Sequence, residues 1–254
     1  MRPAMGATLM ADITNVQPES AAALPRRRHR GRPVPARARP GGIVTEGISR
    51  HWWWRPGWRP GSRFYTFHFT FAAQPAVQEL AAQAREQLAA FAWLDPVPGE
   101  WLHCTTQGVG FAGEVSEADL SAIADAARAR FATVAAAAVT ITAPHAAGEG
   151  ALCDVVPAGS LDRARDAARA AIADVRGADR VPGALEWSPH VSVAYANADG
   201  PVAPVDAALA GIQPATAILA ALDLIRLGRD RHVYEWETIA SISSAGVIQG
   251  SRSS

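Results

Sequence analysis

The pattern of apolar and polar positions predicts regular secondary structure from about residue 63 to about residue 240. The first element is a strand at residues 64–71, because this run is aromatic and β-branched. Pro75 then stands where a helix can begin, and the apolar residues after it keep helical spacing on one face. Those residues are Val77, Leu80, Ala81, Ala84, Leu88 and Phe91. The pattern therefore predicts a strand followed by an amphipathic helix.

Three more elements complete the first unit of this pattern. Residues 101–111 are typical of a second strand that ends in glycines. The run from Ser116 to Asp119 resembles a capping box, with Asp in place of the usual Glu, and predicts a helix that ends near Phe131. A third strand is expected at residues 139–142. The first unit is thus strand, helix, strand, helix, strand.

The same order of elements returns in the second part of the chain. A strand, a helix capped by Ser160, another strand and a short helix are expected at residues 152–156, 160–175, 190–195 and 202–212. A closing hairpin around residues 228–230 should follow, with strands at residues 218–227 and 233–239. Each unit has too few strands to bury its own sheet. We therefore expect two pseudo-symmetric α+β halves rather than two independent domains.

The two ends of the chain have a different composition from the expected domain at residues 63–240. Residues 1–50 lack an apolar period and are rich in Pro, Arg and Gly, so we expect a disordered basic tail. This tail could be solvated, or could contact nucleic acid or an acidic surface. It could also be an over-extended start, since Met5 and Met10 are alternative initiators. A flexible C-terminal tail is expected at residues 241–254.

A Trp-rich segment, residues 51–62, leads from the basic tail into the domain. It holds four tryptophans within seven residues. So much aromatic surface is costly to leave in water, and we expect these side chains to pack on the folded domain. Aromatic side chains interleaved with Arg could instead stack on bases. Nucleic-acid binding is therefore the alternative role for this segment.

Charge and cysteine content narrow the possible functions. Residues 1–62 hold eleven Arg against three carboxylates, a balance of +8, and the remainder holds thirteen Arg against 21 carboxylates, a balance of −8. The acidic domain argues against long polynucleotides as ligands, because phosphate binding needs a positive field. Cys104 and Cys153 do not support a disulfide framework or a structural metal. No apolar run approaches the roughly 18 residues of a membrane span, so we expect no membrane contact. Residues 1–20 also lack an apolar core of signal-peptide length, and we therefore expect a cytoplasmic protein. We expect no metal and no cofactor.

Two matching triplets carry the candidate chemistry. They are His103-Cys-Thr105 and His190-Val-Ser192, each in the second strand of one half. Side chains two positions apart in a strand share a face, so each histidine and its hydroxyl should point at one ligand, while Cys104 should point away. Phosphodiester chemistry needs such a set. One imidazole takes a proton from the attacking oxygen, another protonates the leaving oxygen, and hydroxyls donate to the phosphoryl oxygens.

A third triplet, His68-Phe-Thr70, lies in the first strand. His68 could be an extra donor on the floor of the cleft, or a buried histidine held by the backbone. We keep it as a secondary candidate for substrate binding. The closing hairpin also carries polar side chains, of which one could reach the phosphate, although most arginines in such a hairpin are expected to be solvated. They are Arg226, Arg229, Arg231 and Tyr234.

The residues around both main triplets resemble the two-histidine phosphoesterases, also called the 2'-5' RNA ligase-like superfamily. Members carry two His-x-Thr/Ser motifs at a similar separation, and residues 102–110 and 188–195 are similar to their motif neighbourhoods. The resemblance covers about residues 63–240. It implies a bilobal α+β fold in which two antiparallel sheets form a central cleft and the helices lie outside. It also implies a metal-independent site made of His103, Thr105, His190 and Ser192.

The chain departs from this family at two places. Bacterial RNA-ligase-type members commonly have a mostly hydrophobic run after the first triplet, where this chain has Thr106-Gln-Gly108. They often place Arg shortly after the second triplet, where this chain has Tyr195. A tyrosine cannot supply the charge with which Arg binds phosphate bidentately. We keep Tyr195 as a candidate for substrate binding.

These observations predict a metal-independent phosphodiesterase that opens 2',3'-cyclic phosphate ends or small nucleotide phosphodiesters. His103 and His190 would act as general acid and base, and either of them could be the base. The expected partner is a small nucleotide or an RNA end, and the protein is expected to be monomeric. Two alternatives stay open: a non-catalytic module that binds nucleotides or phosphate esters, and an RNA 2'-5' end-joining activity.

Overall fold

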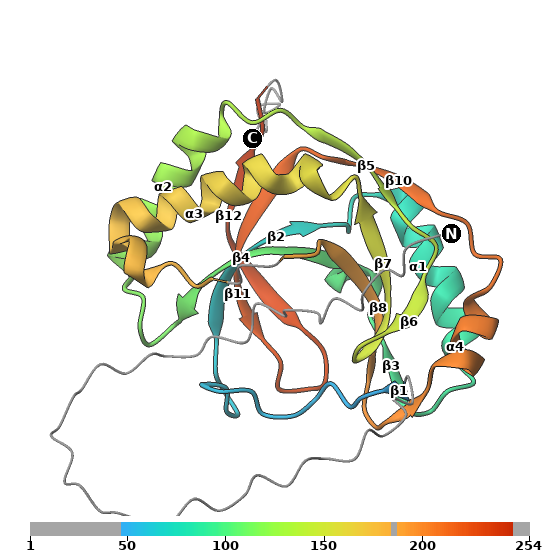
Figure 1. The fold of residues 1–254 in the computed structure, drawn as a ribbon. Coiled ribbons are helices and arrows are strands. Elements are labelled where there is room, and N and C mark those ends of the chain that lie inside the picture. Colours follow the sequence, from blue (N-terminus) through green and yellow to red (C-terminus); the bar gives the residue numbers. More distant parts are fainter. Residues whose placement is uncertain (1–46, 184–186, 246–254) are drawn as a thin grey trace, which may run out of the picture.

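A computed structural model describes residues 47–183 and 187–245 of the chain. Two antiparallel sheets lie in its centre, and four α-helices cover them on the outside (Figure 1). This is the α+β architecture that the repeated pattern and the resemblance predict. The expectations for residues 1–46 and 246–254 lie outside the described residues.

The first sheet has the strand order β12-β11-β2-β4. Its strands are β2 (Phe64–Thr70), β4 (His103–Phe111), β11 (Ala221–Gly228) and β12 (Glu235–Ser243). All neighbouring strands are antiparallel. The register places His68 of β2 directly opposite Thr105 of β4. Directly opposed residues share a face of the sheet, so the third triplet and the first face the same side.

The second sheet has the order β10-β5-β7-β8-β3, and β6 also pairs with β7. Its strands are β3 (Leu94–Pro96), β5 (Ala137–Ile141), β6 (His145–Ala147), β7 (Gly150–Val156), β8 (His190–Ala196) and β10 (Ala215–Leu219). Strand β8 of this sheet contacts β4 of the first sheet. The two strands that begin with a triplet histidine are therefore neighbours across the sheets.

Two pairs of helices flank the sheets. They are α1 (Pro75–Leu88), α2 (Glu117–Phe131), α3 (Asp162–Arg176) and α4 (Val202–Leu209). Helix α2 packs on α3 and on β12, whereas α1 packs on α4 and on β10 (Figure 1). Helix α1 begins at Pro75 and buries the apolar face that its spacing predicts. The Ser116 hydroxyl caps α2 by accepting a hydrogen bond from the amide of Asp119 at 3.0 Å.

The two halves of the sequence exchange strands. Strand β5 of the first half pairs with β7 and β10 of the second. In return, β11 and β12 complete the sheet that β2 and β4 begin. Each helix pair likewise combines one helix from each half. Neither half can bury a sheet alone, and the exchange makes one hydrophobic core out of both.

Three local expectations were wrong. Ser160 does not cap α3: it lies in a short 3₁₀ helix, η2 (Ala158–Leu161), and α3 follows with Leu161 at its N-cap. The single strand expected at residues 218–227 is two strands, β10 and β11, which belong to different sheets. An uninterrupted apolar run does not show where the chain leaves one sheet for another. Strand β12 continues to Ser243, beyond the expected end of the domain at residue 240.

Residues 47–62, which we call the strap, pack against the domain. Strand β1 (Gly47–Ile48) pairs with β9 (Gly200–Pro201), so ordered structure begins before the Trp-rich segment. Trp52 and Trp58 are only 6% and 5% exposed, whereas Trp53 and Trp54 are 44% and 51% exposed. The prediction that the tryptophans pack on the domain is therefore correct for the two buried side chains, Trp52 and Trp58, and wrong for the two exposed ones.

Candidate active site

His103 is the first residue of β4 and is almost completely buried. Its Nδ1 lies 2.8 Å from the carbonyl oxygen of Trp101. A carbonyl only accepts hydrogen bonds, so Nδ1 carries the hydrogen and Nε2 is the proton-accepting nitrogen of the neutral ring. The indole of Trp236 packs edge-on against this imidazole, with 5.3 Å between ring centroids. The backbone and Trp236 thus fix both the orientation and the tautomer of His103.

His190 has the same arrangement in the other half. It is the first residue of β8, and its Nδ1 lies 2.9 Å from the carbonyl oxygen of Ser188. As with His103, the acceptor is the carbonyl two residues upstream. The same argument assigns the hydrogen to Nδ1 and makes Nε2 the accepting nitrogen. The repeated sequence motif therefore corresponds to a repeated hydrogen-bond geometry.

One cavity of about 440 Å³ brings the two triplets together. All six site residues that the sequence suggests line it: His68, His103, Thr105, His190, Ser192 and Tyr195. Cys104 lies outside this lining and is fully buried, and its burial raises the pKa of the thiol to about 12. This agrees with the expectation that Cys104 points away from the cleft, because a thiol that stays protonated is a poor nucleophile.

His68 lies beneath His103. The two imidazole rings are parallel within 4°, with centroids 4.5 Å apart, and His68 is 1% exposed. Burial, and to a smaller extent the charge that His103 can carry, holds the pKa of His68 well below its ordinary value. Neither of its ring nitrogens has a hydrogen-bond partner among the described residues. The backbone contact that a purely structural histidine would need is thus missing in this part of the chain.

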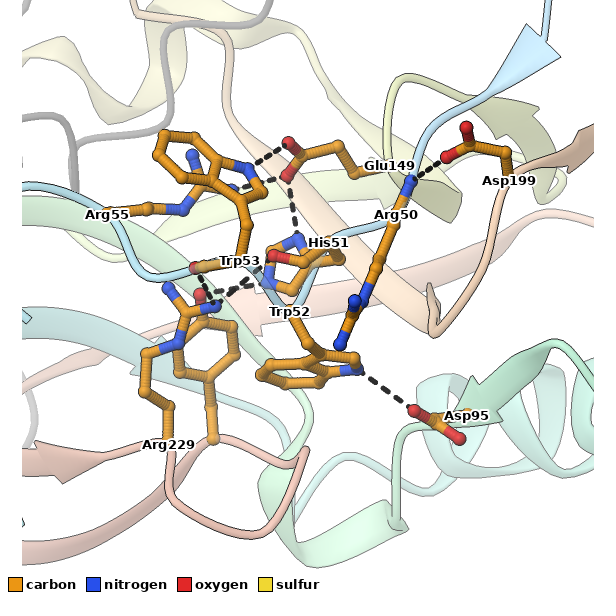
Figure 2. Close-up of polar contacts among 10 residues, drawn as sticks. Arg50, His51, Trp52, Trp53, Arg55, Asp95, Glu149, Asp199 and Arg229 are labelled. Carbon is orange, nitrogen blue, oxygen red and sulfur yellow. Dashed lines mark hydrogen bonds and ion pairs between the residues drawn. The ribbon is translucent and has the colours of Figure 1, made fainter. Parts of the chain in front are cut away.

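The strap adds residues to the cavity that the sequence analysis missed. Ser49, His51 and Arg55 line it, together with Glu149 from the turn between β6 and β7. Figure 2 shows the side chains of His51, Arg55 and Trp53 converging on the carboxylate of Glu149. The spacing of residues offers no signal for this cluster. One indication of it was present in the sequence: His51 and Arg55 lie inside a segment whose aromatic surface is expected to pack on the domain.

Tyr234 connects this cluster to the catalytic candidates. The Nδ1 of His51 lies 2.8 Å from Glu149, and its Nε2 lies 2.9 Å from the hydroxyl of Tyr234. Tyr234 in turn packs edge-on against His103, with ring centroids 6.0 Å apart. Burial alone would raise the pKa of Glu149. The hydrogen bond from His51, the charge of Arg55 and the hydrogen bond from Trp53 together lower this pKa by more than burial raises it, so the net shift is downward. Glu149 is therefore an anion at neutral pH.

Arg229 does not fit the expectation of a solvated hairpin arginine. It is 3% exposed, and its guanidinium donates to the carbonyl oxygens of His51 and Trp53 (Figure 2). The same group lies over the rings of Trp52, Trp58 and Tyr234. Arg226 and Arg231 form exposed ion pairs with carboxylates of β12, as expected for surface arginines. Arg229 therefore holds the strap rather than substrate.

Comparison with known protein families decides what kind of domain this is. A model of the 2'-5' RNA ligase superfamily matches residues 94–231, which include both triplets. The chain belongs to the 2'-5' RNA ligase superfamily. None of the curated proteins matches it. The strap lies outside the matched residues.

Solved structures share the fold of this superfamily member. The protein TT0787 of Thermus thermophilus is 19% identical, has a TM-score of 0.56, and covers 73% of this chain and 98% of its own. E. coli LigT complexed with 3'-AMP is 14% identical, has a TM-score of 0.52, and covers 72% of this chain and 99% of its own. E. coli LigT complexed with NADP+ is 15% identical, with a TM-score of 0.50 and coverage of 72% and 98%. At these identities the likeness shows the fold.

Metal-binding groups and membrane-spanning helices are both absent from the described residues. No group of three or more His, Cys, Asp or Glu side chains in residues 47–183 and 187–245 is placed to hold a metal ion. No helix in the same residues is long and apolar enough to cross a membrane. The polar side chains that line the cavity of this 2'-5' RNA ligase superfamily member include imidazoles, hydroxyls, one guanidinium and one carboxylate, and apolar and aromatic side chains such as Leu152, Trp187 and Leu227 complete the lining.

Proposed function

We propose that this protein is a metal-independent phosphodiesterase that opens 2',3'-cyclic phosphate ends or small nucleotide phosphodiesters. The observation that carries the proposal is the pair His103 and His190. Both line one cavity, and both donate Nδ1–H to the carbonyl two residues upstream. An imidazole held in this way can take or give a proton at Nε2.

The proposed reaction uses the two histidines in opposite protonation states. One neutral imidazole removes a proton from water as the water attacks the phosphorus of the cyclic phosphate in line. The other, protonated imidazole gives its proton to the departing ribose oxygen, so one P–O bond forms and one breaks. The product is a phosphomonoester with a free neighbouring hydroxyl. Either histidine can be the base, because their hydrogen-bond geometry is the same.

Hydroxyl groups and a third imidazole would bind the non-bridging oxygens. Thr105 and Ser192 lie two residues after the histidines and line the same cavity, so their hydroxyls can donate to the phosphoryl oxygens. His68 is neutral because of burial, and in that state one ring nitrogen can donate and the other accept. We assign to it a secondary role in substrate binding. Tyr195 lines the cavity as well and would contact the nucleoside or the phosphate.

The size of the cavity supports a small substrate. About 440 Å³ is in the usual range of small-molecule sites. A mononucleotide or the end of an RNA fits such a volume, and a long polynucleotide would have to extend beyond it, over a domain whose sequence from residue 63 onward has a net negative charge. E. coli LigT, which shares the fold, was crystallised with 3'-AMP and with NADP+. We infer that this chain also binds a nucleotide.

One assay separates this function from its alternatives. The full chain is incubated with 2',3'-cyclic nucleotides in the presence of EDTA, and formation of the phosphomonoester is followed. Turnover that EDTA does not reduce, and that the double variant His103→Ala/His190→Ala lacks, is the expected result. Tight binding of the nucleotide without turnover would instead indicate a binding module. Joining of RNA ends that carry 2',3'-cyclic phosphate and 5'-hydroxyl groups, without hydrolysis, would indicate the end-joining activity.

A further inference from the structure

The arginine of the cavity lining comes from the strap. Among the described residues that line the cavity, Arg55 is the only arginine and Glu149 the only carboxylate, and the chain has no lysine. Arg55 is 6% exposed and forms an ion pair with Glu149. An arginine is always protonated, whereas an imidazole can be neutral. Arg55 is therefore the one permanent cation of the cavity lining in this part of the chain.

The strap holds Arg55 in a fixed position. The amide of Ser49 donates to the carbonyl of Gly148, and the amide of His51 donates to the carbonyl of Ala196. The indole of Trp52 donates to Asp95 at 2.9 Å (Figure 2). These bonds connect the strap to the β6–β7 turn and to β8, which both contribute to the cavity. A guanidinium placed in this way is preorganised for a ligand.

A second buried guanidinium lies beside the cavity. Arg55 and Glu149 compensate each other, and Arg229 adds a second buried guanidinium behind the strap. Within the described part of the chain, the partners of Arg229 are two carbonyl oxygens and three aromatic rings, none of them an anion. A buried positive charge of this kind favours an anion in the neighbouring cavity.

We propose that Arg55 binds a phosphate group of the substrate in this cavity. The planar guanidinium has five N–H donors on different edges, so it can keep its ion pair with Glu149 and bind phosphoryl oxygens as well. His51 keeps Glu149 in place, and its ring is stacked on Tyr195, with 4.3 Å between centroids. Among the described residues of the lining, the site's one arginine thus comes from the strap and not from β8. The proposal rests on the proposed function, because it takes this cavity to be the substrate site.

The test measures binding rather than turnover. Isothermal titration of the full chain in EDTA would compare 3'-AMP, adenosine 3',5'-bisphosphate and adenosine, which differ only in their phosphate groups. For Arg55→Gln we expect the Kd for the phosphorylated ligands to rise about tenfold or more, because a charge-assisted hydrogen bond is lost, with no change for adenosine. A larger loss for the bisphosphate indicates that Arg55 binds the second phosphate. Equal losses of affinity for the two nucleotides indicate that Arg55 binds the phosphate they share, which is the one that reacts.

Arg59 supplies the matched control. It is an exposed arginine of the same strap that does not line the cavity, so Arg59→Gln should bind all three ligands like the wild type. A folded Arg55→Gln variant that binds both nucleotides as tightly as the wild type would overturn the proposal. So would a wild-type chain that binds neither nucleotide more tightly than adenosine.

A second variant guards against misfolding, because Arg55→Gln leaves Glu149 without its partner cation. The double variant Arg55→Gln/Glu149→Gln removes both charges of the pair. If it is folded and still binds phosphate weakly, Arg55 contacts the ligand. If it regains full binding, Arg55 only neutralises Glu149, and the proposal fails.

Turnover and binding separate this inference from the proposed function. Arg55-dependent binding of 3'-AMP without hydrolysis of cyclic nucleotides would support the phosphate site and refute the enzyme. Hydrolysis that depends on His103 and His190, together with nucleotide binding that Arg55→Gln does not weaken, would support the enzyme and refute the phosphate site.

Discussion

Replacing Trp52 by alanine tests whether the strap is a structural part of the domain. Trp52 is 6% exposed, and its indole stacks on His232 within 6° of parallel. It also packs edge-on against His51, with centroids 4.7 Å apart. Its Nε1–H donates to Asp95 at 2.9 Å. A truncation at this position removes packing on several sides and a hydrogen bond together.

The expected loss is large. Truncation of a buried Trp to Ala typically costs about 3–5 kcal/mol in the free energy of unfolding. For a domain of this size each kcal/mol shifts Tm by roughly 2–4 °C, so Trp52→Ala should lower Tm by about 6–20 °C. Trp54, two residues away, is 51% exposed, so Trp54→Ala should change the free energy by no more than about 0.5 kcal/mol. The two variants differ in burial and not in the residue type removed.

Urea denaturation followed by far-UV circular dichroism gives the two free energies. Both variants start from the full chain, so loss of the tail does not enter. If Trp52→Ala costs less than about 1 kcal/mol, the buried indole does not stabilise the domain, and the structural role of the strap is refuted. Equal losses for both variants would also refute the reasoning, because burial would then not determine the effect.

Three further predictions concern His103, His190, His68 and Glu149. Alanine at either catalytic candidate should lower kcat about 10²–10⁴-fold, and the double variant should lose far less than the product of the single losses; steady-state kinetics with unchanged Tm checks this, and near-full rate in either single variant would make that histidine structural. His68→Phe should keep or raise Tm, because it replaces a buried polar ring that lacks a hydrogen-bond partner among the described residues, while turnover falls; a large drop in Tm with normal turnover would show the opposite. The pKa of Glu149 is lowered below its ordinary value of 4.5, so its contribution to stability is present above that value and is lost as the pH falls through the lowered pKa. The melting temperatures of the wild type and Glu149→Gln should therefore converge as the pH falls below 4.5 and through the lowered pKa, whereas a difference that stays constant with pH would contradict this assignment.

Local sequence patterns predicted most of the elements because their causes are local. Pro75 begins α1 where its fixed backbone angle suits a first turn, and the Ser116 hydroxyl caps α2. Ser160 failed as a cap because the chain makes a short 3₁₀ helix there before α3 begins. The run at residues 218–227 failed for another reason. Its apolar side chains satisfy two different sheets, and only packing decides where the chain crosses between them.

The sequence by itself determined the candidate chemistry. The alternation of side chains along a strand places His103 with Thr105, and His190 with Ser192, whatever the rest of the chain does. Duplication of the pattern was enough to predict that the two pairs meet, and one cavity holds both. The carbonyl bonds that fix both imidazoles also arise locally, two residues upstream of each histidine.

Only the tertiary structure decided which charges surround that chemistry. Arg55 and Glu149 are 94 positions apart, and Arg229 is 176 positions from the Trp53 carbonyl that it holds. No periodicity of helix or strand relates such residues, because their contact depends on how the strap crosses the β6–β7 turn and the β11–β12 hairpin. Burial in the folded domain then shifts pKa values in a way that the sequence cannot show. It lowers the pKa of His68 and raises that of Cys104, so one side chain stays neutral and the other unreactive.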